Sequence, residues 1–524
     1  MEAAQDGRPT MDDARAVLAQ HFGYQAFRPG QERVIEAVLQ GRDVLAVMPT
    51  GSGKSVCYQV PAVLLDGLTI VVSPLVSLMA DQVRALKEAG IRGSFFNSTL
   101  KPHVRPEVLR RALAGWYDIM YVAPERLSDP VFCEFAAQAR IPIVAVDEAH
   151  CVSQWGQDFR PAYQQIAAFV ESLPVRPPVM ALTATATGRV RSDISGLLAL
   201  RNPVVQVSGF DRPNLRFASF ELQPKRREQW VAGYIRQHPG DAGIVYAQTR
   251  KKVEQLADKL REQGVAALAY HAGMSDDDRT EAQRAFAHDD CLVLVATTAF
   301  GMGIDKSNVR FVINCGLPLS LEEYYQEAGR AGRDGEPADC YLLWSKGDIR
   351  TCHFFIDNVD AEGLSPEERE RVVANKERLL GEMIGYAMSE TCLRRRILRY
   401  FGQDVSALGD GCGRCSACDG ETPERYLRQQ RRASAAVERV RAARALRDEV
   451  SHDDDDQLFE RLRVLRKQLA EQQGLPPYMV FSDATLRAMV RRRPQTAEEL
   501  LQVSGVGQVK LERYGKAFLR ELEA

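Results

Sequence analysis

The stretch that decides the fold is Val44-Leu45-Ala46-Val47-Met48-Pro49-Thr50-Gly51-Ser52-Gly53-Lys54-Ser55. An apolar run ends in a glycine-containing turn, and a helix-compatible run follows from Val56 to Leu65. Gly51 and Gly53 allow backbone conformations that a side chain would forbid. Their N–H groups, together with the start of the next helix, can cradle a polyphosphate. This pattern predicts a phosphate-binding loop after a buried strand.

The residue types of the loop fit nucleotide chemistry. Lys54 can reach the β- and γ-phosphates, and the Ser55 hydroxyl can ligate Mg²⁺. Met48 stands where the strict motif has glycine, so the loop follows a looser Pro-Thr-Gly-Ser-Gly-Lys-Ser form. The alternative is a glycine turn before an amphipathic helix. We assign six loop residues to nucleotide binding, and Lys54 also to catalysis: Thr50, Gly51, Ser52, Gly53, Lys54 and Ser55.

Length and composition limit the class of protein. A chain of 524 residues suggests about three to four domains. It has no run of 18 apolar residues, so we expect no membrane span, and its polar N-terminus predicts a cytoplasmic protein. The net charge of −2 means that a nucleic-acid partner needs a local basic surface. Seven of the eleven cysteines are scattered singly and predict buried thiols.

Apolar runs alternate with helical patterns after the loop, which is typical of a parallel sheet covered by helices. These runs lie at 69–73, 119–122, 143–146 and 179–182. The third run ends in Asp147-Glu148-Ala149-His150. Asp147 is placed to hold the Mg²⁺ that Ser55 ligates, Glu148 to deprotonate the attacking water, and His150 to sense the γ-phosphate. An acidic surface loop is the alternative.

Three motifs in this order resemble superfamily 2 helicases: Gly51–Ser55, Asp147–His150 and Thr183-Ala184-Thr185. Residues 151–161 resemble the aromatic-rich loop of RecQ DNA helicases, and Phe27–Gln31 resembles that family's additional N-terminal motif. The resemblance implies two RecA-like motor lobes that use ATP to move along DNA.

The N-terminal motif suggests a contact with adenine. The Gln31 amide carries the donor and acceptor that an adenine edge requires, and Tyr24 is able to stack on the base. We assign Tyr24, Arg28 and Gln31 to the nucleotide. A helix start with proline and glycine punctuation is the alternative, and from these residues alone it is favoured.

The resemblance also implies DNA contacts. In the aromatic-rich loop, Trp155 and Phe159 suit stacking on single-stranded bases, with Arg160 beside them; core aromatic residues are the alternative. Gln157 stands where the family usually has histidine, so a titratable ring is replaced by an amide. Three further segments resemble motifs that grip the DNA backbone, a positioning role. Their candidate contacts are Ser73, Asn97 and Arg126.

A second alternation follows Gly209–Asn214, which resembles the inter-lobe joint; its apolar runs lie at 243–247, 266–270, 292–296 and 311–314. No second phosphate loop is present in the sequence. Arg330 and Arg333 are three residues apart, which places them on one face of a helix. As arginine fingers they would stabilise charge on the transferring phosphoryl group; a solvated basic helix is the alternative. Segments 271–273 and 299–306 resemble further motifs of this lobe.

Four cysteines follow the second lobe: Cys392, Cys412, Cys415 and Cys418. Four thiolates at this spacing suit a closed, structural Zn²⁺ site, and in a cytosolic chain they favour metal over disulfides. The arrangement resembles the RecQ zinc module.

The C-terminal part departs from the longer family members. The longer members carry a winged-helix domain after the zinc module, and residues 420–456 of this chain are too few to form one. Residues 423–450 form one basic helical pattern, and a phosphate-binding helix and a solvated linker remain equally open. Residues 458–522 resemble the helicase-and-RNase-D C-terminal (HRDC) domain. Its Gly505-Val506-Gly507 turn serves either phosphate contact or tight helix packing.

The sequence therefore predicts an α/β protein with two RecA-like parallel-sheet lobes, a helical zinc module and a small all-α domain. The expected bounds are 1–207, 208–345, 346–420, a linker at 421–456, and 457–524. The family resemblance implies an ATP-dependent DNA helicase that moves 3′ to 5′ in recombination and repair, using ATP, Mg²⁺ and structural Zn²⁺. We expect a monomer that binds single-stranded DNA, tailed or branched duplexes, and single-stranded-DNA-binding protein. The rivals are a translocase with weak unwinding and a nucleotide-switched DNA-binding scaffold.

Overall fold

The computed structural model describes residues 9–74, 76–156, 158–300, 306–358, 365–425 and 453–523. Three predicted features therefore lie partly or wholly outside the described residues: Gln157, most of the motif at 299–306, and the basic helix at 423–450. The chain divides into two compact units, and each is described by itself. Unit 1 comprises Met1–Phe210 with Pro494–Glu523, and unit 2 comprises Asp211–Arg493.

Unit 1 is built on a seven-stranded parallel sheet with the order β3-β4-β2-β5-β6-β1-β7. Most strands are buried along their whole length, as the apolar runs predict for a sheet covered on both faces. The four predicted runs after the loop are found as strands. The strands are β1 (Val44–Val47), β2 (Thr69–Val72), β3 (Gly93–Phe96), β4 (Ile119–Val122), β5 (Val144–Val146), β6 (Val179–Thr183) and β7 (Val204–Val207).

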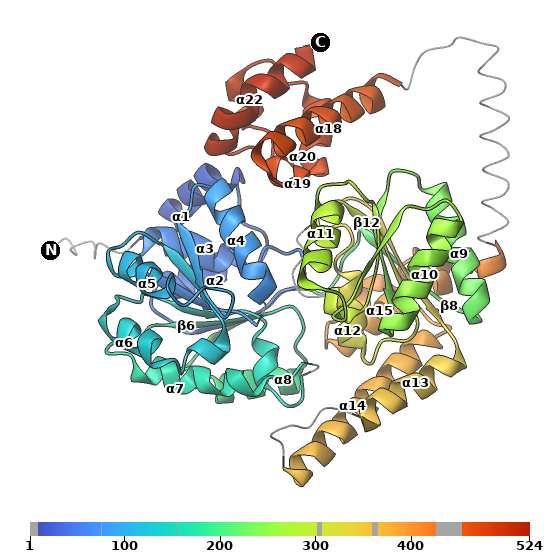
Figure 1. Ribbon diagram of the computed structural model, residues 1–524, viewed down its shortest axis with the longest axis horizontal. Helices are drawn as coiled ribbons and strands as arrows, with labels where there is room; N and C mark the ends of the chain where they lie inside the picture. The colour runs from blue at the N-terminus through green and yellow to red at the C-terminus, as the bar shows by residue number, and fades with distance from the viewer. Residues whose placement is uncertain are drawn as a thin grey trace. The chain divides into compact units, whose positions relative to one another are not determined.

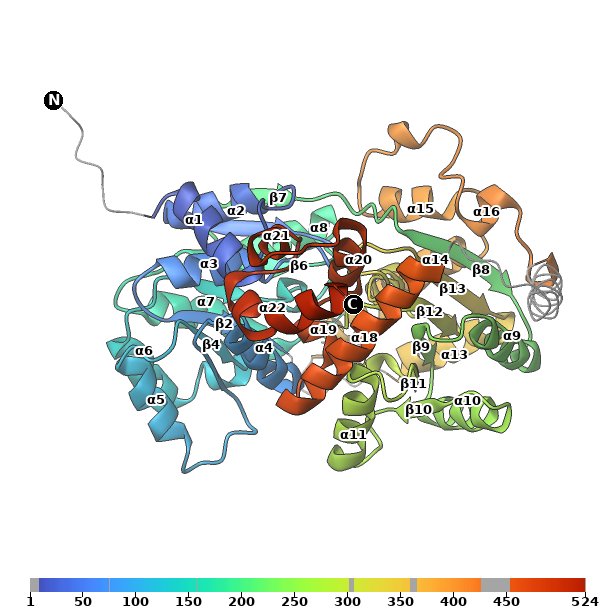
Figure 2. The same ribbon diagram turned by 90° about the horizontal axis from the view of Figure 1, so that it is seen from above.

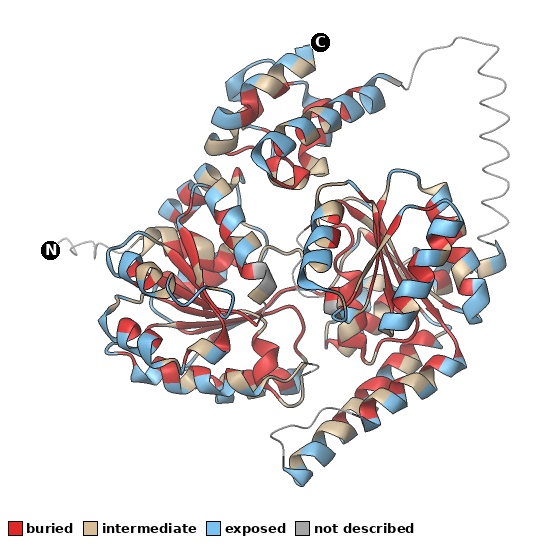
Figure 3. Ribbon diagram, in the orientation of Figure 1, coloured by how far each residue is buried: buried red, intermediate tan, exposed pale blue. Residues whose placement is uncertain are grey.

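Helices cover both faces of this sheet (Figures 1 and 3). The first four helices pack on one face, and α6 and α7 on the other, where Phe132 stacks between Phe96 and Phe169. The helices are α1 (Met11–Val17), α2 (Gln31–Leu39), α3 (Val56–Leu64), α4 (Val76–Glu88), α5 (Arg105–Leu113), α6 (Pro130–Gln138), α7 (Gln165–Ser172) and α8 (Gly188–Leu197). Unit 1 also includes α21 (Ala497–Leu501) and α22 (Gln508–Glu523).

Unit 2 holds a six-stranded parallel sheet with the order β10-β11-β9-β12-β13-β8. One face is covered by α9 and α10, where Trp230 packs edge-on to Tyr341 with ring centroids 4.6 Å apart. The strands are β8 (Leu215–Glu221), β9 (Ala242–Ala247), β10 (Ala267–Tyr270), β11 (Val293–Ala296), β12 (Val309–Cys315) and β13 (Ala338–Trp344). The helices beside them are α9 (Pro224–Gln237), α10 (Arg250–Glu262), α11 (Asp276–Ala287) and α12 (Leu321–Ala328).

The rest of unit 2 is helical. A hairpin of α13 (Lys346–Asp357) and α14 (Pro366–Ala387) leads to α15 (Leu393–Tyr400) and the short α16 (Ser416–Asp419). These last two helices lie beside the edge strand β8 (Figure 2), where the Ser219 N–H donates to Ser416 Oγ at 3.2 Å. Three helices complete the unit: α18 (Asp453–Gln473), α19 (Pro477–Val480) and α20 (Asp483–Arg492).

The predicted fold class is confirmed: two parallel-sheet lobes, a helical zinc-binding region and a helical C-terminal part. The order of strands in unit 1 also positions a site. Because β5, β6 and β1 are neighbours and parallel, their carboxyl ends meet at one edge of the sheet. Within the described residues, no helix combines the length and the apolar character needed to cross a membrane.

Candidate functional site

The loop from Met48 to Ser55 connects β1 to α3 at this edge. Gly51 and Gly53 adopt φ angles of 82° and 83°, in the left-handed region that the sequence pattern predicts for them. Lys54 donates from Nζ to the Met48 carbonyl at 3.3 Å. Met48 itself is fully buried in the core beneath the loop, so its side chain does not compete with a phosphate for space.

Gln31, at the first turn of α2, supports this loop. Its Nε2 donates to the carbonyls of Ser52 and Gly53 at 3.1 and 3.0 Å, and its Oε1 accepts from the Arg28 N–H at 2.8 Å. Arg28 also donates to the Gly51 carbonyl. Gln31 is therefore engaged by the loop, and reading an adenine edge would require it to exchange these contacts. Tyr24 lies 39% exposed, as a ring that stacks on a base must.

The carboxylates expected at the end of β5 are in place. Asp147 donates its N–H to the Val72 carbonyl at 2.9 Å, which fixes it beside β2. Its side-chain Oδ1 accepts the N–H of Glu148 at 3.0 Å. Burial, with the neighbouring Glu148 carboxylate, raises the pKa of Asp147 to about 6, while Lys54 opposes this rise. A cation bound beside this carboxyl would lower its pKa and favour its ionised form, so the site suits a metal ion.

Glu148 adopts a left-handed φ of 47°, which is uncommon outside glycine. The turn aims its carboxylate back at His150, whose Nδ1 lies 3.3 Å from Glu148 Oε2. The same nitrogen lies 2.9 Å from the Thr183 hydroxyl at the end of β6. The two motifs that the sequence places 33 residues apart are therefore in direct contact.

The aromatic-rich loop follows this turn. Trp155 is half-buried, and the Arg189 guanidinium of α8 stacks over its ring at 3.1 Å from the centroid. Phe159 and Arg160 are also partly accessible. Arg160 pairs with Asp158 at 3.1 Å and donates to the Pro74 carbonyl at 3.3 Å. These side chains keep the partial exposure that contact with DNA requires.

The candidate backbone contacts differ in accessibility. Ser73 and Asn97 are 0% and 1% exposed, and Asn97 accepts from the Thr99 N–H at 2.9 Å. In this conformation both side chains are buried and are not available to a phosphate. Arg126 is partly exposed and pairs with Asp129 at 3.3 Å.

In unit 2, Arg330 and Arg333 follow α12, which ends at Ala328. The expectation that both lie on one helical face was wrong in its geometry. Gly332 has a φ of 56°, and the chain from 329 to 335 forms successive turns instead. Asn214 holds this segment by donating to the Gly332 carbonyl at 2.8 Å. A side chain at position 332 would meet Asn214 Nδ2 at 2.4 Å, so glycine is required there.

We call residues 329–335 the arginine turn. Arg212 also holds it in place, because its guanidinium donates to the carbonyls of Gly332 and Ala331 at 2.9 and 3.1 Å. Arg330 is 7% exposed. The predicted joint at Gly209–Asn214 thus fixes the two candidate arginine fingers within unit 2.

The four cysteines expected to bind zinc converge. All four Sγ atoms lie within 4.8 Å of one another, and a tetrahedral zinc–thiolate site has sulfur atoms about 3.8 Å apart. Cys392 caps α15, and its sulfur accepts from the N–H groups of Arg395 and Cys412 at 3.4 and 3.3 Å. Although burial raises the pKa of this thiol, these backbone donors outweigh it and lower the pKa. The donor set and spacing fit a zinc ion.

Comparison with protein-family models assigns four segments. Residues 28–194 match the DEAD/DEAH box helicase model, and 226–335 match the helicase conserved C-terminal domain. Residues 346–419 match the RecQ zinc-binding model, and 455–522 match the HRDC domain.

Among curated proteins, the chain is 36% identical to ATP-dependent DNA helicase RecQ of Bacillus subtilis, across 98% of each chain. It is 37% identical to the protein of the same name from Haemophilus influenzae, over 97% of this chain and 95% of that one. This chain belongs to the RecQ family.

Among solved structures, the fold resembles that of the DUF1998 helicase MrfA bound to DNA, with a TM-score of 0.54, 18% identity, and coverage of 72% of this chain and 55% of that one. The Mycobacterium smegmatis helicase Lhr bound to ssDNA and AMP-PNP gives a TM-score of 0.52 at 18% identity, covering 69% and 56% of the two chains. At these identities the likeness supports the fold alone.

Two side chains of this RecQ-family site were not predicted from the sequence. Arg189 stacks on Trp155 from α8, and Tyr163 donates its hydroxyl to the Asp147 carbonyl at 2.9 Å. Neither belongs to a motif, and each reaches the site only through the folding of the sheet edge. Tyr163 is fully buried close to the catalytic candidates; an aromatic residue soon after the acidic motif is its only sequence signal.

Proposed function

We propose that this protein is an ATP-dependent DNA helicase that moves 3′ to 5′ on single-stranded DNA and unwinds duplexes in recombination and repair. The observation that carries the proposal is the convergence at one sheet edge of the Met48–Ser55 loop, the Asp147–His150 turn and Thr183. Membership of the RecQ family supports the same activity and the choice of DNA. Full-length similarity to the RecQ proteins supports its extension to the whole chain.

The nucleotide roles follow from geometry and chemistry. The Gly51–Gly53 backbone and Lys54 bind the phosphates, and Thr50, Ser52 and Ser55 complete the loop. Asp147 and Ser55 hold Mg²⁺, which when bound neutralises phosphate charge and orients the γ-phosphate. Glu148 accepts the proton of the attacking water.

Three N-terminal residues complete the nucleotide site. We assign Tyr24 to stacking on adenine. Arg28 and Gln31 hold the loop through its carbonyls. Recognition of the base by Gln31 would require its amide to exchange these hydrogen bonds for ones to adenine.

Arg330 and Arg333 are proposed to act on the γ-phosphate held by the first lobe, as the arginine fingers of related phosphoryl-transfer enzymes do. Their support is the arginine turn itself, which Arg212 and Asn214 hold in a defined conformation.

The DNA contacts are proposed from accessibility. Trp155 and Phe159 stack on bases, while Arg160 and Arg126 contact phosphates. Ser73 and Asn97 support these loops from within. The cysteine cluster holds a structural zinc that stiffens the arm after the second lobe.

The remaining assignments rest on the sequence and the family. We propose the five domain bounds given above, a monomer, a cytoplasmic location that becomes nucleoid-associated in a bacterial cell, and single-stranded-DNA-binding protein as a partner. The substrates are single-stranded DNA and tailed or branched duplexes.

A second candidate is a DNA-stimulated translocase with weak unwinding. The observation favouring it is the short span between the zinc cluster, which ends at Cys418, and α18, which begins at Asp453. This span is too short for a winged-helix domain, so another element would have to separate the strands. A nucleotide-switched scaffold is less well supported, since Lys54, Glu148 and both arginines are all present.

The deciding experiment measures strand displacement and ATP turnover on duplexes with a 3′ or a 5′ single-stranded tail. A helicase displaces the strand only from the 3′-tailed duplex; turnover without displacement identifies the translocase. Lys54→Ala is expected to abolish turnover while DNA binding persists. Persistent hydrolysis in that variant would disprove the assignment of the loop.

A further inference from the structure

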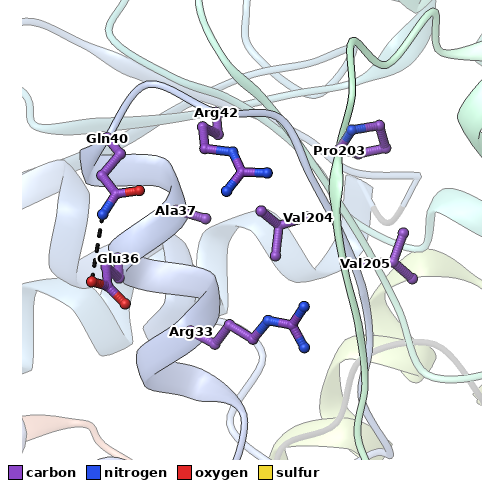
Figure 4. A pocket seen from close by; sticks show the side chains of 8 residues that line it. All are labelled: Arg33, Glu36, Ala37, Gln40, Arg42, Pro203, Val204 and Val205. Carbon is purple, nitrogen blue, oxygen red and sulfur yellow. Dashed lines mark hydrogen bonds between the residues drawn. The ribbon is translucent and has the colours of Figure 1, made fainter.

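A groove of about 470 Å³ lies on unit 1 between α2 and strand β7 (Figure 4). Val204 points into it from the strand, and Val205 points away (Figure 4). None of its residues belongs to the motifs assigned above. We call it the β7 groove, and it is lined by Arg33, Glu36, Ala37, Gln40, Arg42, Pro203, Val204 and Val205.

One wall of the β7 groove is an open sheet edge. In the described sheet β7 is the outermost strand and pairs only with β1. The N–H groups of Val204 and Ser208 donate toward β1, to the carbonyls of Asp43 and Val47, at 2.8 Å each. Since the hydrogen-bonding direction alternates along a strand, Val205 and Val207 turn their N–H and C=O groups outward. Both are also well exposed, at 43% and 40%.

The other wall carries positive charge. The guanidinium groups of Arg33 and Arg42 enter the space between α2 and the strand from its two ends (Figure 4). Among the described residues, the Arg33 side chain has only a long hydrogen bond, to Gln206 Oε1 at 3.4 Å. The Arg42 side chain has no hydrogen bond or ion pair in the described part of the chain. The single acid, Glu36, accepts from the Gln40 amide at 3.4 Å.

We propose that the β7 groove binds an extended acidic peptide of a partner protein, which adds to the sheet as a strand beside β7. The outward N–H and C=O groups of Val205 and Val207 supply its backbone hydrogen bonds, and Arg33 and Arg42 pair with its carboxylates. This mode of recognition uses a sheet edge for affinity and alternate side chains for specificity.

The geometry sets the sequence pattern of the peptide. On an added strand, every second side chain lies on the same face of the sheet as Val204 and Gln206, where both arginines are. The other side chains lie on the face of Val205 and Val207. The peptide therefore alternates acidic and apolar residues, with successive carboxylates about 7 Å apart along the strand.

A nucleic acid fits this surface less well. Its backbone offers phosphate acceptors for the arginines, but no regularly spaced donor for the outward carbonyls of Val205 and Val207. Those carbonyls would lose water without gaining a partner, which is costly.

The test uses a fluorescein-labelled ten-residue peptide of alternating valine and glutamate, with an alternating valine and lysine peptide as its control. Fluorescence anisotropy with the full-length protein is expected to detect the acidic peptide only. The double variant R33E/R42E should weaken binding at least about tenfold by reversing both charges. The matched variant R110E/R140E, which reverses two exposed arginines elsewhere on unit 1, should bind as the unmodified protein does.

A second variant tests the strand edge separately. Val205→Pro removes one outward N–H, which an edge strand tolerates without losing its pairing to β1, and is expected to weaken binding by a similar factor. Adding the acidic peptide should slow hydrogen exchange at the Val205 and Val207 amides. Equal binding of both peptides, equal loss in R110E/R140E, or unchanged exchange would overturn the proposal. The proposal would also be overturned if the R33E/R42E variant no longer bound single-stranded DNA but bound the acidic peptide with unchanged affinity.

Discussion

His150 Nδ1 lies 2.9 Å from the hydroxyl of Thr183, and this contact joins the turn after β5 to the end of β6. Both side chains are buried. The Thr183 hydroxyl donates onward to the Thr185 carbonyl at 3.1 Å, so it accepts from the imidazole N–H. Glu148 Oε2 lies 3.3 Å from the same nitrogen. The proposed water-activating carboxylate is thus linked through one imidazole ring to the end of β6.

Thr183→Val should weaken this link without a change of side-chain shape. We expect the contact to hold Glu148 in place in the transition state for hydrolysis. If it contributes about 0.5–1.5 kcal/mol there, as an ordinary hydrogen bond does, DNA-stimulated ATP turnover falls about two- to twelvefold. DNA affinity without nucleotide should not change. Thr183→Ser keeps the hydroxyl and should restore most of the activity. Equal turnover in the two variants would show that the hydroxyl has no role.

The raised pKa of Asp147, about 6, predicts a specific pH dependence of stability. The folded protein keeps this proton at pH values where the unfolded chain, with a pKa near 4, has lost it. The free energy of unfolding contributed by Asp147 therefore falls as pH rises from about 4 to about 6, and is level above that. In metal-free buffer, Asp147→Asn should remove this contribution and stabilise the protein at pH 7.5 by about 1–3 kcal/mol.

Denaturant unfolding of the two proteins at pH 4.5 and 7.5 measures this difference directly. Added Mg²⁺ should stabilise the unmodified protein and leave Asp147→Asn unaffected. A constant difference between the proteins at the two pH values would contradict the assigned shift.

Gln31→Ala distinguishes two roles for one amide. If Gln31 mainly braces the loop through Ser52 and Gly53, its loss should raise the dissociation constants of ATP and GTP together, by about tenfold for two hydrogen bonds. If it reads adenine, ATP binding should fall selectively. Titration with both nucleotides decides. We expect the first result, since Gln31 Nε2 already donates to two carbonyls of the loop and Oε1 already accepts from the Arg28 N–H.

These contacts show what the sequence was able to predict. The β1 and β5 runs are continuous and apolar because both faces of a parallel sheet are covered, so the positions of Lys54 and Asp147 followed from local pattern. The arrangement of the arginine pair did not follow from local pattern. The three-residue spacing of Arg330 and Arg333 suggested a helix, but α12 already ends at Ala328. Gly329 comes next, and Gly332 adopts a left-handed backbone conformation.

Some strands and contacts were also missed. β3 begins with glycine, and β7 is an edge strand of alternating burial, so neither has the continuous apolar run of a central strand. The stacking of Arg189 on Trp155 and the bracing of the loop by Gln31 join distant segments. Such contacts leave no periodic signal in one sequence.

The cysteine cluster gives the last prediction. The purified protein should contain about one zinc per chain, and Cys415→Ser should lose it, because a closed structural site needs all four thiolates. Without the metal, α15 and α16 lose the cross-link that holds Cys392 against Cys412. The Ser416 contact with β8 and the Arg216 pair with Asp419, at 2.8 Å, should then open.

Hydrogen exchange across residues 390–420 should accelerate in Cys415→Ser, while the sheet of unit 1 stays protected. Cys133→Ser is the matched control, since Cys133 is an exposed thiol far outside the cluster in sequence, and it should retain both zinc and protection. A zinc-free preparation with normal protection across 390–420 would refute a structural role for the metal. Zinc lost equally from Cys133→Ser would refute the assigned ligands.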